Sequence, residues 1–189
     1  FGIPTKEEIE LKECPFEKEA GAVVLIHEAF SYQGNYTELV TTHHIRIKIL
    51  NDKGISAANI AISFYSENNF EHIDNIEAMT INVESEGLLK KTKSIGEITF
   101  AFPSVKKGSI IEYQYRSVMQ NYWGLKDWYF QDDIPIMISR YHLKMIQDKQ
   151  FVYRVNKRPE LEITVLNEPG KLFFEMRNIP SLTDEPYMD

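Results

Sequence analysis

The sequence predicts an all-β domain, an antiparallel β-sandwich with about ten or more short strands and little helix. Three observations lead to this prediction. Apolar and polar side chains alternate along many segments, Gly, Pro, Asn and Asp residues separate these segments, and no segment keeps a helical period for more than a turn or two. A parallel α/β fold is disfavoured, because its strands are joined by long crossover connections that are usually helical.

Near the N-terminus the chain predicts one short helical turn. Thr5 and Glu8 stand three residues apart, a spacing at which each side chain can bind the backbone N–H of the other residue at the start of a helix. Cys14 precedes Pro15, whose ring moves the residue before it toward extended backbone. From this point on we expect strands.

The clearest strand is predicted over residues 37–50, where one face is mainly apolar and the other is polar. The first face holds Leu39, Thr41, His43, Ile45, Ile47 and Ile49, and the second holds Thr42, His44, Arg46 and Lys48. Residues 51–54, Asn-Asp-Lys-Gly, have the composition of a tight turn. We therefore expect a hairpin partner over residues 58–64.

Further strands follow from the same alternation and the same turn signals. A long one with a single irregularity is expected over residues 73–83. The others are expected at residues 88–92, 98–102, 109–118, 128–131, 138–145, 161–166 and 171–176. No internal repeat and no low-complexity linker divides the chain, so we expect residues 1–189 to form a single domain.

Composition and charge exclude several classes of protein. Apolar residues make up 43% of the 189 residues and the formal net charge is -7, which are ordinary values for a globular protein. The basic residues are scattered, whereas nucleic-acid binding needs clustered Lys and Arg, so that class is set aside. The longest apolar stretch, residues 20–26, is too short for a membrane span.

Because the chain begins at Phe1, we expect a processed or trimmed product whose signal peptide has been removed.

Residues that could carry chemistry are few, and none forms a recognisable site. Cys14 is the only cysteine and has no activating neighbour in the sequence. Asp132 and Asp133 are more typical of a solvated strand end than of a calcium site. The two adjacent histidines would point to opposite faces of a strand, and we expect all five to be structural or exposed: His27, His43, His44, His72 and His142. We therefore predict no catalytic residue, no cofactor and no metal ligand.

Aromatic residues concentrate in one part of the sequence, and they are the only candidates for a binding surface. Seven fall between residues 113 and 130: Tyr113, Tyr115, Tyr122, Trp123, Trp128, Tyr129 and Phe130. Alternation places some of these rings in the core. The remainder could dock a partner or stack on a sugar, and the candidate interaction surface is Tyr122, Trp123, Trp128 and Tyr129.

Several segments together resemble one known family. They are EAGAVVL (19–25), HIRIKILNDKG (44–54), FPSVKKGSIIEY (102–113), DWYFQ (127–131) followed by IP (134–135), and DEPYM (184–188). In their order and spacing they resemble a bacterial domain of unknown function found N-terminal to transglutaminase-like, cysteine-protease-type catalytic domains in secreted proteins. Residues 92–102 form a shorter stretch than this family usually has.

This resemblance implies an immunoglobulin-like or related β-sandwich, export to the periplasm or the cell exterior, and a downstream domain with a Cys-His-Asp catalytic set. The family has no assigned catalytic residues in this domain. We therefore expect a non-catalytic accessory domain that packs against or positions the transglutaminase-like or peptidase-like domain of the same polypeptide. The alternative is a cell-surface module that binds a glycan or a peptide through exposed aromatic residues. An independent enzyme is the least favoured interpretation.

Overall fold

The computed structural model describes residues 1–84, 89–94, 99–121, 125–145 and 152–182, and of residues 89–94 it describes only the backbone. Within these residues the strands are long and the helices are short. The elements are α1 (Lys6–Glu10), β1 (Ala22–Gln33), β2 (Leu39–Ile49), η1 (Asp52–Ala58), β3 (Asn59–Ala61), η2 (Glu67–Asn69), β4 (Glu71–Val83), β5 (Leu89–Ser94), β6 (Thr99–Ala101), β7 (Ile110–Met119), β8 (Ile136–Lys144), β9 (Ile163–Glu168) and β10 (Lys171–Ile179), where η denotes a 3-10 helix.

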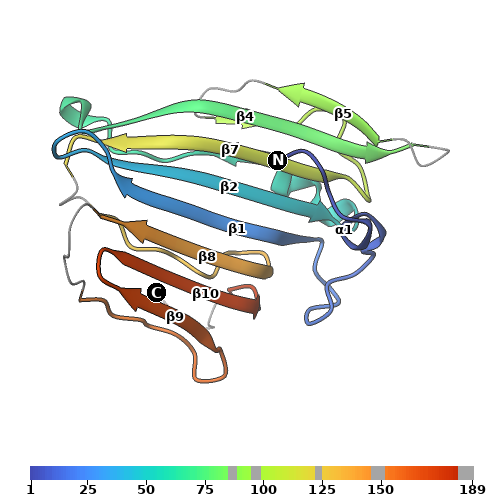
Figure 1. Cartoon of the computed structure of the whole chain (residues 1–189). Coiled ribbons are helices and arrows are strands. Elements are labelled where there is room, and N and C mark those ends of the chain that lie inside the picture. The colour runs from blue at the N-terminus through green and yellow to red at the C-terminus, as the bar shows by residue number, and fades with distance from the viewer. Residues whose placement is uncertain (85–88, 95–98, 122–124, 146–151, 183–189) are drawn as a thin grey trace, which may run out of the picture.

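One large sheet dominates the fold (Figure 1), with its eight strands in the order β5-β4-β7-β2-β1-β8-β10-β9. Neighbouring strands are antiparallel except β1 and β8, which are parallel. The short strands β3 and β6 pair with each other in a second, small sheet. Strands β8, β1, β2 and β7 therefore lie side by side in the middle of the large sheet.

The face of the large sheet that carries Ile45 and Ile47 is called the inner face here. It is covered by η1, by the small sheet and by residues 125–135 and 155–161, whose apolar side chains pack against those of the sheet. The buried part of this core includes Ala22, Val24, Ile45, Ile47, Ile49, Ala58, Ala78, Phe102, Ile111, Ile136, Leu161, Met176 and Ile179. Complete burial of one Ile or Val side chain stabilises a fold by about 1.5–3 kcal/mol, so this layer holds the sandwich together.

The opposite, outer face carries the polar side chains of β2 and β7 and is partly covered by the N-terminal segment with α1 (Figure 1). Helix α1 has the predicted capping box, in which Thr5 Oγ1 accepts from Glu8 N and Glu8 Oε2 accepts from Thr5 N. Cys14 is completely buried in a small apolar cluster below this segment, with Val23, Leu25 and Leu50.

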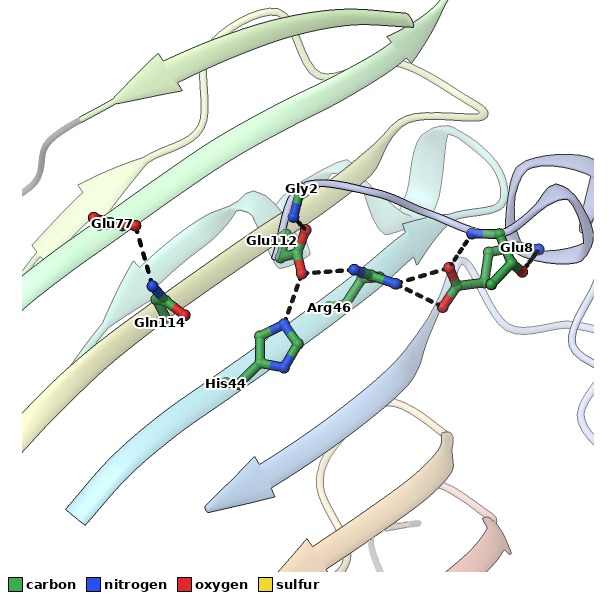
Figure 2. A network of polar contacts seen from close by, with 8 residues as sticks. Gly2, Glu8, His44, Arg46, Glu77, Glu112 and Gln114 are labelled. Carbon is green, nitrogen blue, oxygen red and sulfur yellow. Dashed lines mark hydrogen bonds and ion pairs between the residues drawn. The ribbon is translucent and has the colours of Figure 1, made fainter. Parts of the chain in front are cut away.

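A network of buried charges joins the N-terminal segment to the outer face (Figure 2). Glu112 on β7 is completely buried, and its carboxylate accepts hydrogen bonds from Gly2 N (2.6 Å), His44 Nε2 (2.6 Å) and Arg46 Nη2 (2.8 Å). Arg46 Nη1 also donates to both carboxylate oxygens of Glu8, at 3.0 and 2.8 Å. The Lys48 ammonium donates to the backbone carbonyls of Ile9 and Gly108. The pairing follows from the register, because Arg46 and Glu112 are direct cross-strand partners.

Burial by itself would raise the pKa of Glu112, but the hydrogen bonds from His44, Arg46 and Gly2 outweigh it and lower this pKa to about 2. The carboxylate is therefore ionised at all physiological pH values. The network fastens residues 2–9 to the sheet.

Most of the expected architecture is confirmed. The fold is all-β, sandwich-like and poor in helix, and the predicted strands over residues 37–50, 73–83, 88–92, 98–102, 109–118, 138–145, 161–166 and 171–176 correspond to β2, β4, β5, β6, β7, β8, β9 and β10. The irregularity expected in residues 73–83 is a register shift between Asp74 and Glu77, next to Asn75 with its positive φ of 52°.

Three details differ from the prediction. Residues 58–64 are not a hairpin partner of β2, because η1 carries the chain out of the sheet and the short β3 pairs with β6. Residues 128–131 are not a strand, because they cross the inner face and their rings fill it. The sheet is mixed and not wholly antiparallel, because this same crossing segment brings β8 back parallel to β1.

Candidate functional site

A band of polar side chains interrupts the apolar inner face in the middle of the large sheet. Its members come from the four central strands, and the register makes them neighbours: Ser139 is opposite His27, Ser31 is opposite Thr41, Thr41 is opposite Ser117, and His43 is opposite Tyr115. Tyr141 on β8 completes the band. Polar residues inside a sandwich weaken the core unless they have another role, so this band is the candidate functional site.

The band lines a cavity of about 230 Å³ between the sheet and residues 125–129. Its floor on the sheet holds the polar and aromatic residues His27, Ser31, Thr41, His43, Tyr115, Ser117 and Tyr141 and the apolar residues Leu39 and Met119, and its cover consists of Leu125, Lys126, Asp127, Trp128 and Tyr129. Side chains of β4 and of residue Ser63 complete the wall. The cavity therefore collects polar and aromatic groups from segments far apart in the sequence.

Stacked rings form much of the cavity wall. The ring centroids of His27 and Trp128 are 4.3 Å apart, those of Trp128 and Tyr141 are 5.4 Å apart, and those of His43 and Tyr115 are 4.4 Å apart with an interplanar angle of 9°. The last two pairs are stacked, which is favourable beyond the area it buries, and the His27–Trp128 pair is tilted by 33°. The ring contacts help to hold the two imidazoles against the cavity.

Some polar groups of the band are bonded to each other. Ser31 Oγ and Thr41 Oγ1 are 2.7 Å apart, and the Tyr141 hydroxyl donates to Ser31 Oγ at 3.0 Å. Trp128 Nε1 donates to Ser139 Oγ at 3.2 Å, which anchors the covering segment to β8.

One ion pair lies at the rim of the cavity. The Glu71 carboxylate is almost completely buried, and its Oε2 accepts from Lys126 Nζ at 2.6 Å and from Tyr65 N at 2.8 Å. The Lys126 side chain remains about half exposed. The carboxylate is thus compensated by a cation that comes from the covering segment.

Other polar groups of the band have no hydrogen-bond partner among the described residues. They are the imidazoles of His27 and His43 and the hydroxyls of Tyr115 and Ser117. None of these four groups has a completely buried polar atom, since Arg46 Nε is the only buried side-chain nitrogen or oxygen without a partner in the described part of the chain. Their donors and acceptors face the cavity, where they are available to pair with a ligand.

The two imidazoles of the cavity carry no charge near neutral pH. Burial lowers the pKa of His27 to about 4, and burial, with smaller contributions from His27 and Lys126, lowers the pKa of His43 to about 4. Both imidazoles are therefore neutral, and each offers one donor and one acceptor. Burial also raises the pKa of Tyr115 to about 12, so its hydroxyl keeps its proton.

The residues of the predicted interaction surface have different environments. Tyr122 and Trp123 lie outside the described residues. Trp128 is half-buried and contacts the rings of His27 and Tyr141, so it forms part of the wall of the cavity. Tyr129 is 73% exposed at the rim, and its part in an interaction stays a prediction.

Sequence reasoning missed the polar band, although β2 carried a signal for it. The alternation over residues 37–50 put Thr41 and His43 on the otherwise apolar face and His44 on the other, and the structure confirms this arrangement. In the neighbouring strands, polar residues on the apolar face are harder to recognise from the sequence alone. Ser31, Ser117 and Ser139 become informative only when the strand order is known.

Other residues considered for chemistry lie apart from the cavity. Burial raises the pKa of the Cys14 thiol, which disfavours the nucleophilic thiolate. In the described ranges no group of three or more His, Cys, Asp or Glu side chains could hold a metal ion. In the same part of the chain no helix is long and apolar enough to cross a membrane.

Two comparisons with known proteins find similarity. The profile of a domain of unknown function with solved structures, DUF3857, matches residues 96–183, just under half of the chain. A crystal structure from Parabacteroides distasonis, described as a "putative protease", superposes with a TM-score of 0.59 and 11% sequence identity over 89% of this chain. At that identity the likeness shows the fold alone. No curated protein matches the sequence.

The chain spans only part of the protein that it resembles in structure. The superposed region is 38% of the length of the Parabacteroides protein. The fold therefore occurs as one portion of a larger polypeptide in that case.

Proposed function

We propose that this chain is a non-catalytic accessory domain of a larger secreted protein, and that it packs against or positions a transglutaminase-like or peptidase-like catalytic domain in the periplasm or outside the cell. The observation that carries the proposal is the structural similarity to 38% of a longer protein described as a "putative protease". The resemblance of the five sequence segments supports the identity of the catalytic partner and the export.

The environment of Cys14 supports a catalytic centre located elsewhere. Cys14 is the only cysteine of the 189 residues, and it is completely buried among Val23, Leu25 and Leu50. A nucleophilic cysteine needs access to its substrate and a thiolate at neutral pH. Burial opposes both, so a cysteine-dependent reaction would have to use a residue from another domain.

The rim of the cavity is the first candidate for the contact with that domain. Tyr129 is 73% exposed and Leu125 is 43% exposed, and both belong to the covering segment that Trp128 and Lys126 fasten to the sheet. Exposed aromatic residues on a fixed segment are typical of protein interfaces, where single Tyr and Trp residues often dominate the binding free energy.

The test is an association experiment in trans. The 189-residue chain and the catalytic domain encoded after it in the same reading frame are purified separately and mixed, and binding is measured by calorimetry and by the shift in unfolding temperature. We expect binding, and we expect Tyr129→Ala to weaken it at least tenfold. Tyr36→Ala is the matched control, because Tyr36 is 95% exposed in the β1–β2 turn. Absence of both binding and stabilisation would refute the accessory role.

The cavity favours a second function, the binding of a glycan or a peptide at the cell surface. The observation that supports this function is the set of four polar groups in the cavity that have no partner among the described residues. Exposed aromatic rings are not the basis for it.

A further inference from the structure

We infer that the inner-face cavity binds an uncharged, hydroxyl-rich ring of about the size of one hexose, and that its ligand class is the terminal sugar of a neutral glycan. This inference rests on the second function proposed above and is independent of the accessory role. It follows from the size of the cavity, its charge and its hydrogen-bonding groups.

The size limits the ligand to one ring. The cavity of about 230 Å³ is smaller than the roughly 300–1,000 Å³ that sites for drug-sized molecules occupy. A single sugar ring fits this volume, and an oligosaccharide or an extended peptide does not. A longer glycan would continue outward past Tyr129 and Lys126, which are exposed at the rim.

The charge of the cavity disfavours an anionic ligand. The imidazoles of His27 and His43 are neutral, and the only lysine of the lining, Lys126, is already paired with the Glu71 carboxylate at 2.6 Å. A carboxylate inside the cavity would lose its hydration without gaining an unpaired cation, and Asp127 of the covering segment adds a further carboxylate to the lining. The site therefore selects neutral sugars against uronic acids.

The hydrogen-bonding groups favour hydroxyls over an apolar side chain. Each imidazole offers one donor and one acceptor, and the hydroxyls of Tyr115 and Ser117 can do both. A sugar hydroxyl is also donor and acceptor, so adjacent hydroxyls of one ring can pair with these four groups. An aromatic or aliphatic side chain of a peptide would leave all four unpaired, at a cost for each group.

The binding test uses defined small probes with the 189-residue chain. Methyl glycosides of glucose, galactose, mannose and N-acetylglucosamine represent neutral sugars, glucuronic acid represents an anionic one, and N-acetyltyrosine amide represents a peptide side chain. Saturation-transfer NMR and titration of the histidine ring signals measure binding. We expect at least one neutral glycoside to bind and glucuronic acid to bind at least tenfold more weakly.

Two tyrosines on β7 provide a matched pair of variants. Tyr115 and Tyr113 point to the same face, and neither hydroxyl has a partner among the described residues, but only Tyr115 lines this cavity. Tyr115→Phe should weaken sugar binding about three- to tenfold, the usual effect of losing one neutral hydrogen bond, and leave the unfolding temperature unchanged. Tyr113→Phe should change neither. Ser117→Ala is a second test of the same cavity and should also weaken binding.

Several results would overturn the inference. One is that none of the neutral glycosides binds at millimolar concentration. Another is that Tyr113→Phe weakens binding as much as Tyr115→Phe does. Binding of N-acetyltyrosine amide in preference to every glycoside would overturn the sugar class while leaving a binding function in place. The association experiment in trans is unaffected by these outcomes, so failure of the two proposals can be told apart.

Discussion

The two faces of the large sheet hold their polar groups in different environments. On the outer face Glu112 is completely buried, and three donors surround its carboxylate. On the inner face, a few residues along the same strand, the hydroxyls of Tyr115 and Ser117 face a cavity and have no partner in the described part of the chain.

The comparison separates polar groups that stabilise the fold from those that do not. The outer-face network joins the N-terminal segment to β2 and β7, and only Arg46 Nε remains without a partner there among the described side chains. On the inner face the hydroxyls of Tyr115 and Ser117 make no such bonds in the described part of the chain, so their presence is better explained by binding.

Removing the outer-face carboxylate should have the largest effect. Glu112→Ala leaves the buried Arg46 guanidinium without its main counter-charge, and we expect the free energy of unfolding to fall by about 3–5 kcal/mol. Glu77→Ala is the matched control on the same face, because Glu77 accepts only from the Gln114 side chain (Figure 2), and it should cost less than about 1 kcal/mol. Urea unfolding measures both. Similar losses in the two variants would contradict the structural role of the network.

The two faces should also respond to acid in different pH windows. Unfolded His27 and His43 bind protons near pH 6.5, whereas in the folded state they remain neutral down to about pH 4. The unfolded state therefore binds more protons between these values, and stability falls as the pH is lowered from 6.5 to 4, by about 2 kcal/mol for each imidazole. For Glu112 the folded pKa is the lower one, so its contribution is lost between about pH 4.5 and 2.

Variants of single histidines identify which imidazole causes the pH dependence between 6.5 and 4. His43→Gln should flatten the dependence of the free energy of unfolding on pH between 6.5 and 4. His72→Gln should leave it unchanged, because the His72 side chain is 59% exposed. An unchanged slope in His43→Gln would show that this imidazole is not held neutral by the fold.

A smaller effect distinguishes paired from unpaired hydroxyls within the inner-face band. Tyr141→Phe removes the hydrogen bond from the Tyr141 hydroxyl to Ser31 and should lower the free energy of unfolding by about 1 kcal/mol. Thermal unfolding followed by circular dichroism measures the change. A loss in Tyr141→Phe that is too small to detect would mean that the internal hydroxyl bonds of the band do not stabilise the fold.

Sequence periodicity predicted the elements well and the site poorly. Alternation in β2 located the strand and assigned Ile45 and Ile47 to the core and Arg46 to the other face, because the side-chain direction depends only on the local backbone. The capping box of α1 was predicted for the same local reason. Nothing local indicates that β8 lies parallel to β1, and the position of Tyr141 beside Ser31 follows from that pairing.

The aromatic residues show the same limit of prediction from local sequence. Their concentration between residues 113 and 130 was visible in the sequence, but Trp128 contributes to the cavity wall because residues 125–135 cross the inner face, and that path depends on the tertiary structure. The Glu112 network was likewise not predicted, because it requires the register of β2 and β7 and the return of residues 2–9 to the sheet.

The distinction between the two faces is tested most directly by the stability of one double variant, Tyr115→Phe with Ser117→Ala, measured by urea unfolding at pH 7. Because neither hydroxyl has a partner in the described structure, the free energy of unfolding should be equal to or higher than that of the unmodified chain. A loss of more than about 1 kcal/mol would show that these hydroxyls stabilise the fold and would contradict the assignment of the inner-face band to binding.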